Sequence, residues 1–377
     1  MKQGLLNESI VVLGAVLSIG VAAMAQSVPL EEPKNHGGFH AFAFSPDPSV
    51  IAGGTGVVSL LVNGKKENTQ GGEVILWDTK SGKIRRTLGS HKATVELIAY
   101  SVDGTLLISA SPVNGMIKVW DGKSGVLRQT LQLPGQIGKS SNGSELLCSV
   151  SNDGKSVGAV SIQTSEPAGK GKRIGDTLMV WDAASGRARW QLANSEVYAL
   201  AFSADGSTLV ASCIAYEAKD ALTDAPKVAA AKRTVAWDSS VGKELWNSEM
   251  KGWRPEKLCF VPDKGLFAFD NRRILIVNPA TGARVKEIKL QGKESLRSPW
   301  LSPDGKRFAV SQFMGGAIEW GDTDSGKITA VQEFTADRVT NVAFSPDLQT
   351  AVCNMRFVPQ ILKLSPRPTD AVDAKGR

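Results

Sequence analysis

The sequence is poor in the residues from which most catalytic and metal sites are built. Three His and four Cys are spread over 377 residues. His36 and His40 lie on either side of a Gly-Gly pair that starts a loop, which is a weak arrangement for holding a metal. Most Asp residues fall in turn sequences, where their carboxylates bond to the local backbone. We therefore predict no catalytic residues, no metal site and no cofactor.

Sequences for binding phosphate, nucleic acid or membrane are also missing. Gly-Lys-Ser occurs at 122–124, 138–140 and 154–156, but each copy lacks the Gly five residues earlier that a phosphate-binding loop requires. The net charge of +7 is moderate, and no basic patch of the kind that binds nucleic acid is present. No apolar run after residue 25 is long enough to cross a bilayer. We predict no nucleic-acid partner and no membrane span in the mature chain.

The N-terminal residues have the order of a secretory signal peptide. Lys2 precedes the apolar stretch Ile10–Ala23, and Ala23-Met24-Ala25 has the small residues of a cleavage site. We assign residues 1–25 to the signal peptide and expect cleavage near Ala25, before Gln26. The chain is then exported, to the periplasm or the outside of the cell. Gln26 stands where a lipoprotein has Cys, so no lipid anchor is predicted.

Helical periodicity is absent from Thr94–Leu131, the stretch around which the chain is organised. It consists of four short runs rich in Val, Ile, Leu and Thr, separated by Gly, Asp, Asn, Ser or Pro. This is the pattern of four strands joined by tight turns. One such sheet cannot bury both of its faces, so it needs copies of itself on either side.

Seven copies of the first turn are present; all have Asp at the fourth position, and four continue with Gly, as in Leu301-Ser302-Pro303-Asp304-Gly305. They start at Phe44, Tyr100, Val150, Phe202, Phe260, Leu301 and Phe344. A second landmark follows in six of them, a Trp-Asp pair and then a turn that ends in Gly. These pairs are Trp77-Asp78, Trp120-Asp121, Trp181-Asp182, Trp237-Asp238 and the degenerate Asn278-Pro279 and Trp320-Gly321. The landmarks in phase resemble the WD40 repeats of a β-propeller, over about residues 36–364.

This resemblance implies an all-β fold, a seven-bladed propeller with four antiparallel strands in each blade. The five Trp residues in the third strands are expected to pack between blades. The Gly-His pair of the family survives only as Gly89-Ser90-His91, so the buried His–Ser/Thr–Trp–Asp network of well-formed repeats cannot recur in most blades.

The ends of the propeller predict how the ring closes. After the strand near Gln360–Leu364, Ser365-Pro366-Arg367-Pro368 cannot continue as a ladder strand. The seventh blade therefore lacks an outer strand, and the N-terminal segment 27–33 is expected to supply it, as is usual in the family. We assign residues 26–365 to the propeller and 366–377 to a disordered tail.

Three blades are longer than the others, and the surplus maps between their second and third strands. The inserts are Gly56–Gly72, Gln163–Asp176 and Tyr216–Arg233 in blades 1, 3 and 4. All three should emerge on the face that also carries the links between blades. Insertions on one face often mark a binding face. Sequence drift in tolerant loops is the alternative.

Six residues near that face are candidate binding residues: Trp253, Arg254, Arg297, Arg338, Lys172 and Arg173. Trp253 and Arg254 lie in the loop between blades 4 and 5, and Trp and Arg are enriched at interface hot spots. Arg297 and Arg338 should approach the mouth of the channel. Lys172 and Arg173 lie in the blade 3 insert. A Trp253 that only covers a seam between blades is the alternative.

The four Cys residues are expected to be buried free thiols. Cys148, Cys213, Cys259 and Cys353 fall in predicted first or second strands among apolar residues, where Cys behaves as a small hydrophobic side chain.

Two functions remain open at this stage. The first is a non-catalytic, monomeric scaffold that binds a protein or peptide on the insertion face. The alternative is an enzyme with its site at the channel mouth, either a hydrolase or lactonase or a quinoprotein-like oxidoreductase. Asp182–Trp190 and Asp238–Trp246 resemble the tryptophan-docking repeat of quinoprotein-type propellers, although packing between blades also explains these Trp residues.

Overall fold

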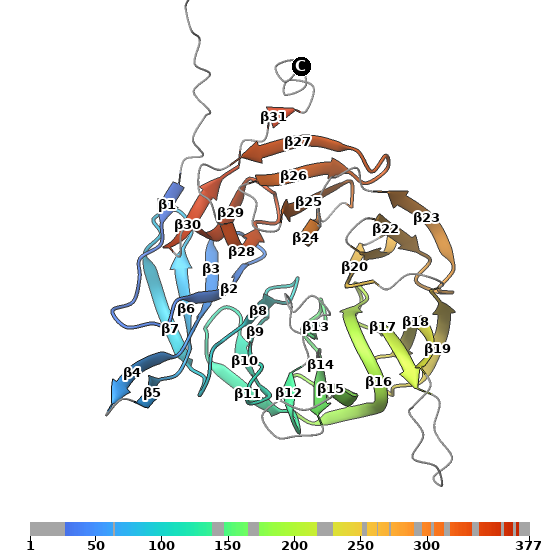
Figure 1. Ribbon diagram of the computed structural model, residues 1–377, viewed down its shortest axis with the longest axis horizontal. Helices are drawn as coiled ribbons and strands as arrows, with labels where there is room; N and C mark the ends of the chain where they lie inside the picture. Colours follow the sequence, from blue (N-terminus) through green and yellow to red (C-terminus); the bar gives the residue numbers. More distant parts are fainter. Residues whose placement is uncertain are drawn as a thin grey trace, which may run out of the picture.

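The computed structural model shows seven blades of antiparallel β-strands arranged around a central axis (Figure 1). The described residues are 27–62, 65–137, 147–164, 173–216, 229–250, 255–261, 263–270, 273–289, 296–302, 305–312, 317–333, 339–355, 358–364 and 367–368. The predicted signal peptide lies outside them. Within them no helix is long and apolar enough to cross a membrane.

Each blade is an antiparallel sheet whose strands follow one another from the centre outwards. Blade 1 contains β2 (Phe39–Phe44), β3 (Val50–Thr55), β6 (Glu73–Asp78) and β7 (Ile84–Ser90). Blade 2 contains β8 (Leu97–Tyr100), β9 (Leu106–Ser111), β10 (Met116–Asp121) and β11 (Leu127–Gln132). Blade 5 contains β20 (Lys257–Val261), β21 (Gly265–Phe269), β22 (Arg273–Val277) and β23 (Arg284–Lys289).

Blades 3 and 4 share one long strand, β16 (Ala188–Phe202), which pairs first with β15 and then with β17. Blade 3 contains β13 (Cys148–Val150), β14 (Ser156–Thr164) and β15 (Arg173–Asp182), with the short β12 (Gln136–Ile137) beside β14. Blade 4 contains β17 (Thr208–Tyr216), β18 (Ala229–Asp238) and β19 (Glu244–Glu249).

The last two blades complete the ring. Blade 6 contains β24 (Leu296–Leu301), β25 (Arg307–Gln312), β26 (Ala317–Asp322) and β27 (Ile328–Glu333), and β31 (Arg367–Pro368) pairs with β27. Blade 7 contains β28 (Val339–Phe344), β29 (Thr350–Met355), β30 (Val358–Lys363) and β1 (Ser27–Pro29). β30 ends at Lys363, in keeping with the prediction that 365–368 does not continue it. Arg367–Pro368 instead pairs with β27 of the neighbouring blade, so the assignment to a disordered tail was wrong for these two residues.

The N-terminal strand closes the ring as predicted. Val28 pairs with Ile361 of β30, and Leu30 is buried with a 3% exposed fraction. The next residue joins blade 7 to blade 1, because the Glu31 carbonyl accepts a 2.8 Å hydrogen bond from the Trp77 indole and its carboxylate accepts one from the Ile84 N–H. The closing segment is thus shared between the two blades that it joins.

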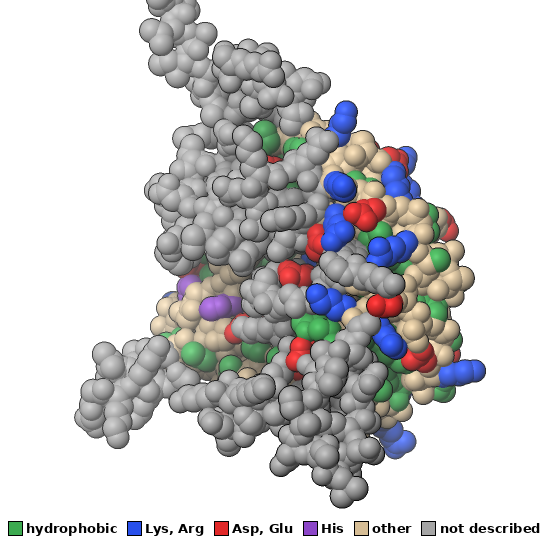
Figure 2. Space-filling view, turned by 45° about the vertical axis from the view of Figure 1, so that its right-hand side comes forward, with side chains coloured by type: hydrophobic (Ala, Val, Ile, Leu, Met, Phe, Trp, Pro, Cys, Tyr) green, Lys and Arg blue, Asp and Glu red, His purple; other side chains and the backbone are tan. Residues whose placement is uncertain are grey.

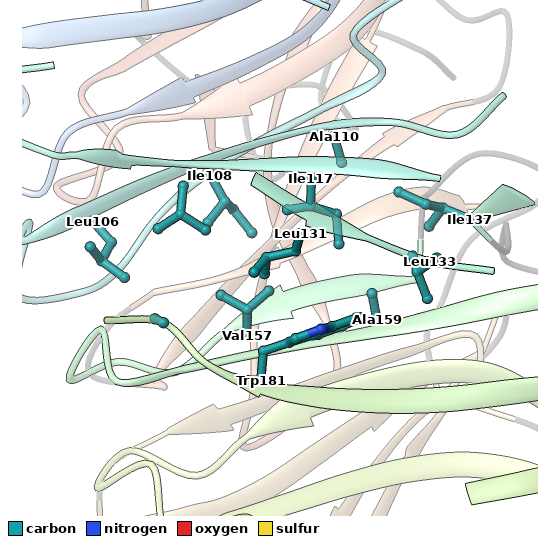
Figure 3. Close-up of a cluster of buried hydrophobic side chains, with 12 residues drawn as sticks. Leu106, Ile108, Ala110, Ile117, Leu131, Leu133, Ile137, Val157, Ala159 and Trp181 are labelled. Carbon is teal, nitrogen blue, oxygen red and sulfur yellow. The ribbon is translucent and has the colours of Figure 1, made fainter. Parts of the chain in front are cut away.

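The core lies between neighbouring blades. In one cluster, Leu106, Ile108 and Leu131 of blade 2 meet Val157 and Trp181 of blade 3 (Figure 3). Four of the predicted third-strand Trp residues are buried against the preceding blade in this way, which confirms their predicted role: Trp77, Trp120, Trp181 and Trp237.

The fifth, Trp320, packs in the opposite direction. The ladder pairs Phe308 with Gly321, the same register that pairs Ile51 with Trp77 in blade 1. Gly321 therefore occupies the Trp position, and a Cβ there would lie 2.0 Å from the Phe308 ring that fills the space. A shift of one residue turns a side chain to the other face of a sheet, so Trp320 packs on Phe344 of the following blade. The alignment of Trp320-Gly321 with Trp-Asp was therefore wrong by one residue.

Blade 5 has the same one-residue difference. Val277 pairs with Leu266 at the Trp position, and the Asn278 side chain accepts hydrogen bonds from the Ala280 and Thr281 N–H groups at the Asp position. The landmark in this blade is therefore Val277-Asn278 and not Asn278-Pro279.

Two outer-strand Trp residues lock neighbouring blades together. The Trp190 indole donates a 2.9 Å hydrogen bond to the Ser239 carbonyl, and its ring lies under Gly242, where a Cβ would approach within 2.7 Å. Trp246 makes the same contacts with Pro279 and Gly282 of blade 5. These contacts confirm packing between blades.

The four Cys residues are free, as predicted. Cys213 and Cys353 are buried, whereas Cys148 and Cys259 are half-buried. Burial raises the pKa of the Cys148, Cys213 and Cys353 thiols to about 12, so these sulfurs are protonated at neutral pH.

Candidate interaction face

One face of the ring carries both the second-to-third strand connections and the links between blades. In blade 1, Gly72 exchanges backbone hydrogen bonds with His91 and Ala93 of the link to blade 2. In blade 2 the Ile137 N–H donates to the Pro112 carbonyl, which joins the equivalent turn to the next link. The surplus segments of blades 1, 3 and 4 follow the same second strands. We call this side of the ring the insertion face.

The blade 1 insert forms a hairpin of its own. β4 (Val58–Val62) pairs with β5 (Lys65–Gln70), and neither strand joins a blade. Figure 1 shows the hairpin projecting away from the ring. Its base is held firmly, because the Gly56 N–H donates to the Gly38 carbonyl and the Glu73 N–H donates to the Thr55 hydroxyl.

The described ends of the other two inserts are strand. β14 extends to Thr164 and β15 begins at Arg173, and these two residues are paired. β17 similarly extends to Tyr216, which pairs with Ala229 of β18. Arg173 is therefore the first residue of a strand, which corrects its predicted place in a loop.

The structure brings few of the predicted binding residues into view. Trp253, Arg254, Arg338 and Lys172 lie outside the described residues. Arg297 lies in β24, where it pairs with Ser311. The hypothesis that these residues form one site therefore stays a prediction.

Acidic residues at the starts of the innermost strands were missed by the sequence reasoning. Glu96 and Glu256 each stand four residues before the first residue of the turn at the other end of the strand, and their N–H groups donate to the second strands. In blade 4 the Glu196 carboxylate accepts a 2.5 Å hydrogen bond from the Tyr198 hydroxyl. All three Glu residues are half-buried. The constant offset from the turn would have identified two of them.

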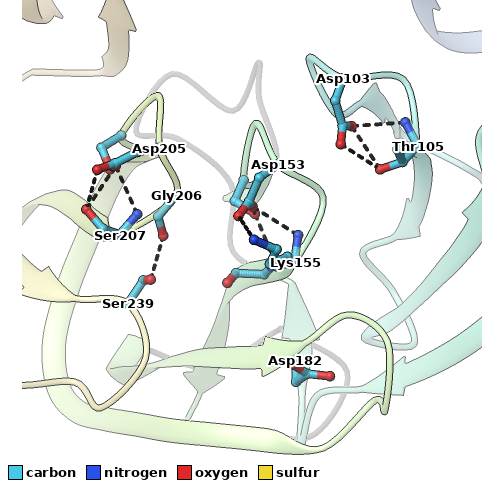
Figure 4. Close-up of polar contacts among 12 residues, drawn as sticks. Asp103, Thr105, Asp153, Lys155, Asp182, Asp205, Gly206, Ser207 and Ser239 are labelled. Atoms are coloured by element: carbon cyan, nitrogen blue, oxygen red, sulfur yellow. Dashed lines mark hydrogen bonds and ion pairs between the residues drawn. The ribbon is translucent and has the colours of Figure 1, made fainter.

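The opposite face repeats one small device around the ring. In five blades the Ser hydroxyl of the first turn donates to the turn Asp at 2.6–2.7 Å: Asp47, Asp103, Asp153, Asp205 and Asp347. Figure 4 shows three of these turns side by side. The Ser203 hydroxyl and the Ser207 N–H hold the pKa of Asp205 below its usual value. These carboxylates serve as turn acceptors, as predicted.

A second ring of carboxylates lies in the turns between third and fourth strands. The Ser185 N–H and the Arg189 guanidinium lower the pKa of Asp182 to about 2. Asp78 and Asp121 have the same Arg partner seven residues later, Arg85 and Arg128. This face is therefore regular, and three of the carboxylates in these turns are paired with Arg.

One serine has the spacing of a nucleophile elbow without the geometry. Gly154-Lys155-Ser156-Val157-Gly158 has the Gly-x-Ser-x-Gly form, but Ser156 follows a turn and opens a strand, whereas an elbow joins a strand to a helix. Its exposed fraction is 2%, and its hydroxyl accepts a hydrogen bond from Arg189. In the described part of the chain, no group of three or more His, Cys, Asp or Glu side chains could hold a metal ion.

Blade 2 contains a buried polar chain between its strands. The Ser109 hydroxyl lies 2.8 Å from His91 Nε2 and accepts a 2.9 Å hydrogen bond from the Trp120 indole. Burial lowers the pKa of His91 to about 3, so the ring is neutral at pH 7. Three members of the His–Ser–Trp–Asp network are thus present in this blade.

The WD40 family model (WD domain, G-beta repeat) matches residues 82–121, which contain His91, Ser109 and Trp120. The structure is also similar to that of the β-propeller domain of Cps50 (Swd1) from Myceliophteria thermophila, with a TM-score of 0.63 over 90% of this chain and 100% of that one. The chain folds as a seven-bladed β-propeller, and one of its repeats matches the WD40 model. The Cps50 domain is 12% identical, a level at which the likeness shows the fold alone.

No curated protein sequence matches this chain. Among solved structures, 1590 chains do match, and a fold shared so widely selects no particular activity. WD40 propellers commonly act as scaffolds for protein interactions.

Proposed function

We propose that this WD40-repeat β-propeller is an exported, non-catalytic scaffold that binds a protein or peptide through the insertion face. The observation that carries the proposal is the difference between the two faces. The β4–β5 hairpin and the extended strand pairs β14–β15 and β17–β18 all belong to the insertion face. The opposite face repeats the same Ser-Asp turn, which offers a partner little variety to recognise.

Deleting the β4–β5 hairpin tests this proposal without breaking blade 1. The β3–β6 ladder ends at Gly54 and Val74, before the hairpin begins. Gly56 and Gly72 are held by bonds to residues outside the insert. Replacing residues 57–71 by a two-residue Asn-Gly turn therefore removes the hairpin and leaves the ladder intact.

The variant and the full chain are used to capture partners from the exported fraction, and the recovered protein is measured per folded propeller. Lys123→Ala, in a turn of the opposite face, is the matched control. The proposal expects the hairpin deletion to lose a partner that the control retains. Equal recovery by all three proteins would contradict it.

A further inference from the structure

We propose that the outer edge of blade 6, strand β27, is a strand-addition site for an extended segment of a protein partner, and that the C-terminal tail of this chain fills the site in cis. This site is separate from the insertion face. It lies on the outer wall of the ring, beside β31 (Figure 1).

The first observation is the strand addition itself. Arg367 pairs with Val331 and Pro368 pairs with Ala330, so blade 6 has a fifth strand. β7, β11, β19 and β23 instead end their sheets in the described part of the chain. The backbone of β27 is therefore in a position and geometry that accept an antiparallel neighbour.

The second observation is the lack of charge along this edge. Soluble proteins protect exposed strand edges with charged side chains, Lys above all. β7 contains two Arg, β11 contains one, and four of the six residues of β23 are charged. β19 begins and ends with Glu. β27 reads Ile-Thr-Ala-Val-Gln-Glu, with a single charge at its last residue.

This protection is visible on the outer wall that carries β19 and β23. Figure 2 shows Lys, Arg, Asp and Glu side chains interspersed there. β27 lacks that pattern, and its Ile328, Thr329 and Val331 are among the residues that favour strands. β11 also contains a single charge, but that charge lies inside the strand, and β11 has only one β-branched residue. Of these five outer strands, β27 is therefore the best template for an added strand.

The third observation concerns the weakness of the strand in cis. The described ladder has two residue pairs, and one of them contains Pro368, which has no N–H to donate. A partner segment without Pro can pair along all six residues of β27. The chemistry of β27 selects an extended, uncharged segment rich in β-branched residues. The apparent affinity of β27 for the partner segment is then reduced, because only molecules in which the tail has left the edge can bind it.

The experiment uses fluorescein-labelled Thr-Val-Thr-Val-Thr as the probe and fluorescence anisotropy as the readout. The mature chain and a version ending at Leu364 are titrated in parallel. Removing the tail is expected to tighten probe binding about fivefold, the worth of one backbone hydrogen bond. Arg367→Gly combined with Pro368→Gly loosens the tail in the full chain and should act in the same direction.

Thr329→Lys locates the site, and Val285→Lys is its matched control. The two residues stand seven positions after Asp322 and Asn278, at the same place in neighbouring blades. Both are exposed. Thr329→Lys should weaken probe binding several-fold, and Val285→Lys should leave it unchanged.

Amide hydrogen exchange completes the test. Saturating probe should slow exchange in β27 of the tail-less chain and leave β23 unaffected. An affinity that is equal with and without the tail overturns the proposal, as does equal weakening by the two Lys variants. Failure of the tail-less chain to bind millimolar probe, or protection elsewhere than β27, also overturns it.

Discussion

Leu30→Ala is the sharpest test of how the ring is closed. Leu30 lies in a cluster with Phe39 and Trp77 of blade 1 and Val352 and Ile361 of blade 7. Removing a buried Leu side chain in such a cluster costs about 3 kcal/mol, because the apolar contact is lost and a cavity remains. With an unfolding entropy of about 2 cal/mol/K per residue, this loss lowers the Tm of a propeller of this length by about 4 °C.

The assay is urea unfolding followed by Trp fluorescence and near-UV circular dichroism. Val285→Ala is the control, because the 65% exposed side chain of Val285 contributes little to the core, and its effect should stay within about 0.5 kcal/mol. If Leu30→Ala also stays within that range, the N-terminal segment does not close the ring in solution.

Four further predictions follow from the closure, the core and the candidate face. A mature chain truncated to begin at Gly37 should melt below the full chain, because Trp77 loses its Glu31 acceptor; an unchanged Tm would contradict this. Thiol titration of the unfolded, unreduced protein should find four thiols, and a count of two or none would show a disulfide. The folded pKa of His91 is lowered from 6.5 to about 3, so the unfolded chain binds the proton first and stability falls as pH drops from about 6.5. Between pH 6.5 and pH 5 the loss should be about 2 kcal/mol, and urea titrations should find it smaller in His91→Gln. Trp253→Ala should weaken partner binding by about 1–2 kcal/mol if Trp253 is an anchor, whereas a Trp that covers a seam would lower Tm and leave affinity per folded molecule unchanged.

The repeat sequence was sufficient to predict the blades and their closure, because each turn and each strand carries its own local pattern. Periodicity could not fix the register within a degenerate copy. In blade 6 the Trp landmark invited an alignment on Trp320, whereas the Asp322 turn and the Phe308–Gly321 pair set the true register. Aligning on the turn that follows, which ends in Thr-Gly in blade 5 and in Ser-Gly in blade 6, would have placed both degenerate blades correctly.

The candidate face was predictable only in outline. The inserts were found from blade length, but whether they formed loops or strands depended on pairing between residues such as Thr164 and Arg173. The Glu residues at the inner strand starts have no pattern beyond their distance from a turn. The sequence did not predict β31. This strand pairs with β27 of blade 6, and the strands β28, β29 and β30 of blade 7 lie between the two along the chain.

The position of β1 has a consequence for where this chain could begin. Ser27 lies opposite Leu362, so the start of β1 and the end of β30 are adjacent, as in the hairpins that join third and fourth strands in other blades. The break in the ring is thus a missing turn and not a missing interface. A short turn with the sequence of Asp182–Arg187 could join Lys363 to Ser27. With the tail and the residues before Ser27 removed, this join would yield a circular chain. Such a circle could be reopened at another link between blades, which makes the fold a candidate for circular permutation.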